Sequence, residues 1–197
     1  MNYLLAITGA SGSIYAKRFI EKVKILNSNR EQQIELSIIF TRTAREVFKA
    51  EIGESIDSFL AEIIQEEEKG TISLIDNSNF HFKYSSGSNK LDGMVILPCS
   101  MGSLGRVANG LSFDLIGRIA DVQLKERRKL VICTRETPLS LIHLRNMIQL
   151  TEAGAIIAPA NPSFYSNANS ITEVIDGFVE RVMDMVGIAP TSDKYRW

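Results

Sequence analysis

The sequence predicts an α/β fold, a doubly wound and mainly parallel sheet with helices on both faces. Short runs rich in Val, Ile and Leu recur along the chain, and most lack the polar alternation of a strand with one solvated face. Segments with the spacing of amphipathic helices lie between these runs, and a glycine-rich turn follows the first of them. The length of 197 residues fits a single domain over residues 1–197.

The strands are predicted at the apolar runs, because a strand covered by helices on both faces needs no polar positions. In chain order these runs are residues 3–7, 34–40, 72–75, 94–97, 130–133 and 155–158. The stretch 76–92 between the third and fourth runs is long, polar and rich in Ser, Asn and Gly, so we expect a functional loop there.

The helices are predicted between the strands. They occupy residues 14–26, 44–51, 114–127 and 141–151, with a last helix running from Ser170 toward Val186. Gly154 is a suitable stop for the fourth helix, and Ser170 with Glu173 has the spacing of a capping box that opens the last one.

The composition excludes several classes of protein. The formal net charge is −1 and no basic face stands out, which argues against a nucleic-acid partner. No apolar stretch approaches the length of a bilayer span, and Met1 leads directly into a strand-like run rather than a signal peptide. We therefore expect a cytoplasmic protein without a membrane span.

The cysteines and histidines give no sign of a metal site. Cys99 and Cys133 end apolar runs without a partner at metal-ligand spacing, so we expect buried free thiols. His81 and His143 also lack companions at ligand spacing, which favours structural histidines.

The stretch TGASG at 8–12 is the first candidate binding element. A strand, a glycine turn and a helix together place unpaired backbone N–H groups and the positive end of a helix dipole at one spot, which suits an anion. Gly9 and Gly12 would let the main chain approach closely, Ser11 adds a hydroxyl, and the small Ala16 would let the helix pack near the sheet. The alternative is a tight turn that binds nothing.

The turn lacks the signature of a dinucleotide site. A dinucleotide-binding turn has glycines at the first, third and sixth positions of its motif, and this turn does not. No acidic residue follows the second predicted strand either. Thr41 and Arg42 follow that strand instead and favour a phosphorylated or flavin ligand over NAD, while Arg42 leaves NADP as a possibility.

Several longer stretches resemble one known family. They are YSSGS at 84–88, ILPCSMGSLGRVANG at 96–110, ADVQLKERRKLVICTRETPLSLIHLRNM at 120–147 and AGAIIAPANPSFY at 153–165. In the same order, and nearly from end to end, they resemble the UbiX-type flavin prenyltransferases. The resemblance implies a Rossmann-like, homo-oligomeric flavoprotein, expected to be a dodecamer, that acts without a metal.

The resemblance also implies a reaction. Members of the family join the dimethylallyl group of dimethylallyl phosphate to N5 and C6 of reduced FMN and release phosphate. The product, prenylated FMN, is the cofactor of UbiD-type decarboxylases, so such a decarboxylase is the expected recipient and ubiquinone biosynthesis a possible context.

Site residues follow from the resemblance position by position. The implied FMN-binding residues are Gly9, Ala10, Ser11, Thr41, Ser100, Met101, Gly102, Ser103 and Arg135. Those implied to bind the prenyl phosphate are Ser86, Gly87, Arg118, Lys125, Tyr165 and Arg181. The implied catalytic residues are Ser11, Glu51, Lys125 and Glu136, and Phe80 and Tyr84 are candidate walls for the prenyl group.

The chemistry explains the need for these residue types. Ionising an allylic phosphate without a metal requires cations and hydrogen-bond donors around the leaving group. Ring closure requires a proton transfer, for which Glu51 and Glu136 are both candidates.

Other interpretations stay open on the residues alone. Residues 125–128 taken alone would be a solvated helix end, Arg181 a surface cation, and Phe164 with Tyr165 a core pair. An FMN-dependent decarboxylase acting on peptidyl cysteine would share the architecture but needs a catalytic histidine, and a non-catalytic flavin carrier would leave the phosphate-side cations unexplained.

Overall fold

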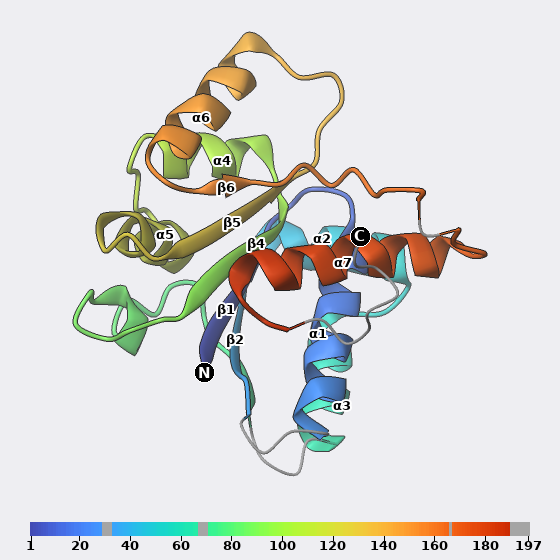
Figure 1. The fold of residues 1–197 in the computed structure, drawn as a ribbon. Helices are drawn as coiled ribbons and strands as arrows, with labels where there is room; N and C mark the ends of the chain where they lie inside the picture. Colours follow the sequence, from blue (N-terminus) through green and yellow to red (C-terminus); the bar gives the residue numbers. More distant parts are fainter. Residues whose placement is uncertain (29–32, 67–70, 166, 190–197) are drawn as a thin grey trace.

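The computed structural model describes residues 1–28, 33–66, 71–165 and 167–189, and within them the strands form one parallel sheet of six strands (Figure 1). The strand order is β3-β2-β1-β4-β5-β6. The strands are β1 (Asn2–Ile7), β2 (Glu35–Phe40), β3 (Ile72–Leu74), β4 (Gly93–Cys99), β5 (Lys129–Thr134) and β6 (Ile156–Ile157). The doubly wound parallel sheet is confirmed, and the order changes direction between β1 and β4.

Each predicted strand is present with shifted ends. The fourth is longer than its apolar run and ends at Cys99, whereas the last shortens to Ile156–Ile157. The short β6 lies at the edge of the sheet, where only β5 pairs with it.

The helices are α1 (Ser13–Ser28), α2 (Arg42–Ile52), α3 (Ile56–Glu66), α4 (Met101–Ala108), α5 (Leu115–Lys125), α6 (Leu141–Glu152) and α7 (Ile171–Val186). The predictions of α1, α2, α5, α6 and α7 are confirmed, with ends moved by at most two residues. Helices α3 and α4 were not predicted. Gly102 and Gly105 weaken the helical pattern of α4.

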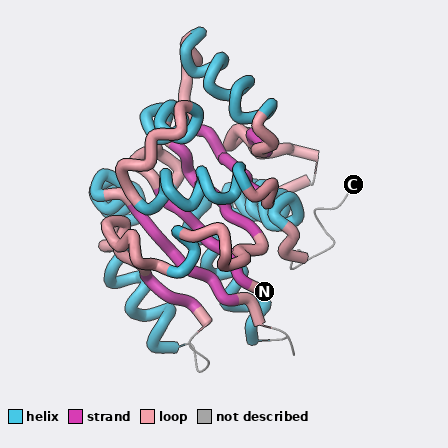
Figure 2. The backbone as a smooth tube through the Cα atoms, turned by 90° about the vertical axis from the view of Figure 1, so that its left-hand side faces the viewer, coloured by secondary structure: helices cyan, strands magenta, loops and turns pink. Residues whose placement is uncertain are grey.

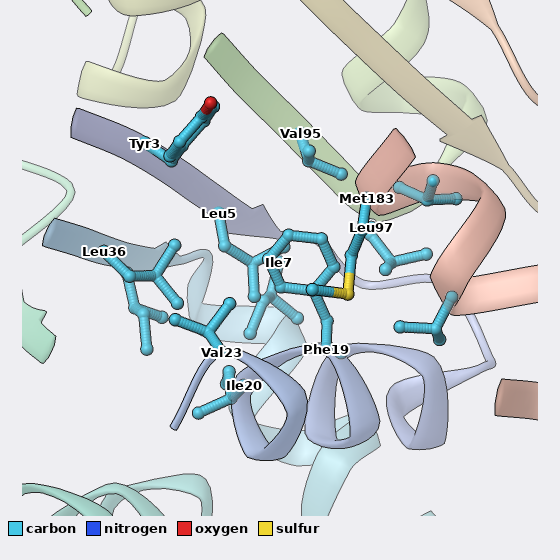
Figure 3. Packing of buried hydrophobic residues seen from close by; sticks show 14 of the residues in the cluster. Tyr3, Leu5, Ile7, Phe19, Ile20, Val23, Leu36, Val95, Leu97 and Met183 are labelled. Carbon is cyan, nitrogen blue, oxygen red and sulfur yellow. The ribbon is translucent and has the colours of Figure 1, made fainter. Parts of the chain in front are cut away.

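The helices divide between the two faces of the sheet, as expected. The apolar residues of α1, α2, α3 and α7 pack on one face, and those of α4, α5 and α6 lie on the other side (Figure 1). On the first face, Leu5 and Ile7 of β1 contact Phe19 and Ile20 of α1 (Figure 3). Ala16 is fully buried there, which confirms that its small size lets α1 approach the sheet.

One buried and one partly buried ion pair also hold α7 on α1. Arg18 Nε donates to Asp176 Oδ1 over 2.7 Å, and Lys22 Nζ donates to Glu180 Oε1 over 2.8 Å. Each charge has a partner of opposite sign, as burial of charged groups requires.

Helix α6 packs on α4 and is exposed over most of its length. Among its residues Leu150 is the buried one, and the helix projects beyond the sheet at the top of Figures 1 and 2. Its start is fixed by a capping box, in which Ser140 Oγ accepts from His143 N and His143 Nδ1 accepts from Ser140 N, each at 3.2 Å. His143 therefore has the structural role expected of it.

The capping box predicted for α7 forms only in part. Ser170 Oγ accepts from Glu173 N at 3.2 Å, but the Glu173 carboxylate accepts from the N–H of Asn169 rather than from that of Ser170. The helix begins where expected, with the second hydrogen bond moved by one residue.

The stretch 76–92 is a loop, as predicted, and carries one short 3₁₀ turn, η1 (Lys83–Ser85). Both cysteines are buried free thiols, which is confirmed. Burial raises the pKa of Cys99 to about 12 and that of Cys133 well above its usual range. Within the described part of the chain, no helix has the length and apolarity to cross a bilayer.

Candidate functional site

The carboxyl ends of β1 and β4 are tied together by Thr8. Its hydroxyl donates to Pro98 O over 2.9 Å and accepts from Ser100 N over 2.8 Å. Since the strand order changes direction between β1 and β4, the segments that follow these strands diverge and leave a crevice. The segments at 9–12 and 100–103 therefore lie beside one crevice.

The glycine turn after β1 binds a carboxylate of the chain itself. Glu51, near the end of α2, accepts from Gly12 N over 3.0 Å and from Ser13 N over 2.8 Å. Both N–H groups lie at the N-terminus of α1, where the sequence analysis predicted an anion-binding site. The structure agrees that the turn suits an anion, and the anion at Gly12 and Ser13 is Glu51. FMN binding by Gly9, Ala10 and Ser11 stays a prediction.

Glu51 is held in its ionised form. Partial burial acts to raise its pKa, but hydrogen bonds from the Ser11 side chain and from the backbone of Ser13 and Gly12 outweigh burial, so the pKa lies below its usual range. Arg135 Nε donates to Ser11 O over 3.2 Å. The structure thus brings Ser11, Glu51 and Arg135 together, as expected of neighbouring site residues.

Glu136 follows Arg135 at the same edge of the sheet. It is exposed, and its carboxylate accepts from Thr137 N over 3.0 Å. Glu51 and Glu136 are therefore both carboxylates near this edge, but Glu51 is the one bound to the glycine turn.

A polar cavity of about 330 Å³ opens beside the crevice. Most of its lining comes from the segments that follow β1, β2 and β4, and the loop 76–92 and the N-cap of α5 add one residue each: Gly9, Thr41, Arg42, Thr43, Asn77, Ser100, Ser103, Arg106 and Asp114. Thr41 caps α2 and Ser100 caps α4, so two helix N-termini face this space. A Cβ on Gly9 would lie 2.6 Å from Thr43 Cγ2, which explains the glycine there.

A larger cavity of about 610 Å³ adjoins the polar one and shares Arg42, Asn77 and Asp114 with it. Phe80 is one of its walls, together with Phe40 and Phe113. Tyr84 is not, because it is buried in the core with its ring 5.3 Å from that of Phe82. The expectation that Tyr84 forms a pocket wall is wrong.

The residues expected to bind the prenyl phosphate do not meet within one chain. Arg118 of α5 donates through Nε to Ser85 O over 3.0 Å, and Gly87 lies against Lys125, with room for no side chain. Gln123 Nε2 donates to Lys129 O over 3.0 Å, which places the end of α5 near the amino ends of the strands, away from the crevice.

Arg181 and Tyr165 lie elsewhere. Arg181 is on α7, on the opposite face of the sheet from α5, and pairs with Asp184 at 2.6 Å. Tyr165 follows β6 and is 79% exposed, and Phe164 beside it is exposed too, so their interpretation as a core pair is wrong.

Two arginines that the sequence analysis did not single out lie at the polar cavity and at the loop 76–92. Arg106 lines the polar cavity, and Arg128 donates to the carbonyl oxygens of Gly87 over 2.7 Å and Asn89 over 2.9 Å. The side chain of Arg128 is only 18% exposed, so it is not part of a solvated helix end. Arg106 is one turn after Ser103 on α4, a signal that required the helix to be recognised.

Among the residues that the structure describes, no group of three or more His, Cys, Asp and Glu could hold a metal ion.

Comparison with known proteins identifies the family. The Flavoprotein family model matches residues 1–183. A flavin prenyltransferase UbiX of Methanocaldococcus jannaschii is 40% identical over 197 residues, which cover 100% of this chain and 98% of the relative. The chain belongs to the UbiX-type flavin prenyltransferases.

Solved structures of UbiX-type proteins share this fold. AnUbiX, solved in complex with FMN and dimethylallyl pyrophosphate, superposes with a TM-score of 0.86 at 36% identity, covering 100% of this chain and 96% of its own. A dodecameric FMN-dependent UbiX-like decarboxylase of Escherichia coli O157:H7 gives a TM-score of 0.84 at 29% identity, with 97% and 96% covered. The Rossmann-like fold expected from the resemblance is confirmed.

Proposed function

We propose that this chain joins the dimethylallyl group of dimethylallyl phosphate to N5 and C6 of reduced FMN and releases phosphate. The observation that carries the proposal is the full-length relationship to curated flavin prenyltransferases, together with the same fold in a relative that holds FMN and a dimethylallyl donor. The product would be prenylated FMN, and a UbiD-type decarboxylase in the cytoplasm is its proposed recipient.

The residues at the crevice fit FMN. The polar cavity offers the hydroxyls of Thr41, Ser100 and Ser103 and two helix N-termini, which suit the phosphate, and Gly9 leaves room for the cofactor's chain. We place the phosphate at Ser100–Ser103 rather than at the glycine turn, because Glu51 already binds the N–H groups of that turn. Reduced FMN supplies the nucleophilic ring atoms that accept the prenyl group.

The remaining FMN-side residues would hold the flavin ring. Ala10, Ser11 and Arg135 border the crevice beside Glu51, and Met101 and Gly102 form the first turn of α4. Ser11 and Glu51 are then close to the flavin edge, where the lowered pKa keeps Glu51 ionised at neutral pH and so leaves it free of a proton, although it also makes this carboxylate a weaker base. Glu136 is the second candidate for this transfer.

The phosphate of the prenyl donor would be bound by Ser86, Gly87, Arg118, Lys125, Tyr165 and Arg181. Negative charge grows on this phosphate as the carbon–oxygen bond breaks, so cations stabilise the transition state more than the bound substrate. Since these residues lie on opposite faces of the sheet, we propose that a homo-oligomer completes each site from more than one subunit. The dodecameric relative supports self-association.

The direct test is anaerobic incubation of the purified protein with reduced FMN and dimethylallyl phosphate, followed by mass spectrometry of the flavin. We expect a flavin heavier by one dimethylallyl group. Recovery of unmodified FMN from protein that binds it would instead indicate a flavin carrier. A peptidyl-cysteine decarboxylase is disfavoured because His143 serves in the cap of α6.

Substitution of Lys125 tests the phosphate-side assignment. We expect Lys125→Ala to leave FMN affinity unchanged and to lower the single-turnover rate of prenyl transfer about a hundredfold, because one lost donor to a developing charge commonly costs about 3 kcal/mol. Lys90→Ala, which removes an exposed cation near the same loop, is the control. If Lys125→Ala reacted at the wild-type rate, Lys125 would be a surface residue without a role in prenyl transfer.

A further inference from the structure

Arg106 places a full positive charge at the polar cavity. It lies on α4, one turn after Ser103, and its Nη2 donates to Ser103 Oγ over 3.2 Å. Ser103 Oγ in turn accepts from Ser100 Oγ over 3.1 Å, so the guanidinium continues a chain of polar groups that begins at the N-cap of α4. Arg106 and both serines line the same cavity as Gly9 and Thr41.

The anionic neighbour of Arg106 is held by other groups. Asp114 Oδ2 lies 3.9 Å from Arg106 Nη1, at the limit of an ion pair. Asp114 Oδ1 accepts from Gly117 N over 2.8 Å as the N-cap of α5, and Oδ2 accepts from Asn77 Nδ2 over 3.3 Å. The carboxylate is therefore fixed by α5 and the loop, and it does not neutralise Arg106 through a close contact.

The second cation beside this cavity is less suited to bind a ligand. The Arg42 side chain is 94% exposed, and its Nε lies 3.9 Å from the Glu46 carboxylate. The Arg106 side chain is 41% exposed. Because water screens an exposed charge more than a partly covered one, Arg106 is the stronger electrostatic partner for a bound anion.

We propose that Arg106 binds the phosphate group of the flavin and gives this enzyme its preference for FMN over riboflavin. The inference rests on the proposed function, since it assumes that a flavin occupies the crevice. At pH 7 a phosphate monoester carries close to two negative charges, whereas each helix N-terminus contributes only about half a positive charge. The planar guanidinium supplies a full charge and can bind two phosphate oxygens at once.

The test compares two ligands that differ only in the phosphate. FMN and riboflavin are titrated into the full-length wild type, Arg106→Ala and Arg106→Lys, with flavin fluorescence as the readout. We expect Arg106→Ala to weaken FMN about tenfold while riboflavin affinity is unchanged, since a hydrogen bond to a charged group carries that much free energy. Arg106→Lys keeps the positive charge but loses the planar guanidinium that binds two oxygens. We expect its FMN affinity to lie between that of the wild type and that of Arg106→Ala.

Arg145→Ala is the matched control, because Arg145 is an exposed arginine on α6 that lines neither cavity. Salt provides a second readout: the FMN affinity of wild type falls more steeply with ionic strength than that of Arg106→Ala. Equal weakening of FMN and riboflavin in Arg106→Ala would mean that Arg106 only maintains the cavity. Unchanged FMN affinity with an unchanged salt slope would mean that the phosphate lies elsewhere.

Either of these two results overturns the inference while the proposed function stands. Failure of the wild type to bind any flavin would instead overturn the proposed function.

Discussion

At the scale of single residues, Glu51 connects the fold to the chemistry. Its carboxylate lies on the N-terminus of α1, where it accepts from Gly12 and Ser13, and it lies beside Ser11 at the crevice. Gly12 has φ of 109°, a conformation that favours glycine, and its N–H donates to Glu51. One side chain thus caps a helix and presents a carboxylate to the proposed flavin edge.

Removal of this carboxylate should lower stability in a pH-dependent way. We expect Glu51→Ala to lower the free energy of unfolding by about 1 kcal/mol at pH 7, as for loss of an N-cap acceptor. Because the folded pKa is depressed, the stabilisation is present above the unfolded pKa of about 4.3 and is lost as pH falls through the folded value.

Urea unfolding at pH 7 and at low pH measures this difference. Glu46→Ala on the same helix removes an exposed carboxylate and is the control. A deficit in Glu51→Ala that persisted unchanged below the folded pKa would contradict the capping role of the charge.

The two cysteines should be inert in the folded protein. Burial raises the pKa of Cys99 to about 12 and raises that of Cys133 as well, so neither forms a thiolate near neutral pH. We expect iodoacetamide at pH 8 to label neither residue in the native state and both in urea, with peptide mass spectrometry as the readout. Native labelling of either one would show that the strand ends open locally.

At the scale of elements, α5 and the turn that follows it hold the loop 76–92 through two arginines. Arg118 donates to Ser85 O, and Arg128 donates to the carbonyl oxygens of Gly87 and Asn89. Since the loop carries Ser86 and Gly87, these contacts set the position of proposed substrate-binding residues. Arg128 acts through the backbone of the loop, which makes it a positioning residue.

Loss of the Arg128 contacts should loosen this part of the loop. We expect Arg128→Ala to speed hydrogen exchange of residues 86–89 roughly tenfold, because two hydrogen bonds from a mostly buried cation are removed. FMN affinity should stay the same, since the crevice is at the other end of the strands. Lys90→Ala is the control, and identical exchange in the two variants would exclude the positioning role.

At the scale of the whole molecule, the sheet separates two groups of proposed substrate residues. Arg118 and Lys125 lie on the side of α5, and Arg181 lies on the side of α7 (Figure 1). A single chain cannot bring both groups to one prenyl phosphate without rearranging its core. The proposed assembly of subunits removes this difficulty, because each subunit then presents its α5 to the crevice of a neighbour.

Mixing of variants tests the shared site. Lys125→Ala and Arg181→Ala should each be poorly active alone, while a refolded equimolar mixture should regain roughly a quarter of the wild-type activity, because random assembly pairs two intact surfaces at that frequency. Light scattering checks that both variants assemble. A mixture no more active than its components would show that each chain builds its own site.

The sequence determined the layout of the protein because its signals are local. Runs without polar positions marked the parallel strands, and Ser170 marked the start of the last helix as its N-cap. The glycine turn at 8–12 and Thr41 with Arg42 indicated a phosphorylated or flavin ligand, whereas the segments at 100–103 and 135–136 were assigned to the site by the family resemblance. Helix α4 was not predicted because its glycines, Gly102 and Gly105, weaken the helical pattern.

Contacts between distant segments were decided only by the tertiary structure. The sequence gives no spacing rule for Glu51 to bind the turn at Gly12, or for Arg106 to reach the cavity beside Gly9. The strand order also decided that Lys125 and Arg181 lie on opposite faces of the sheet. A local pattern reports which face of its own element a residue occupies, but the group it meets across the core depends on how the whole chain packs.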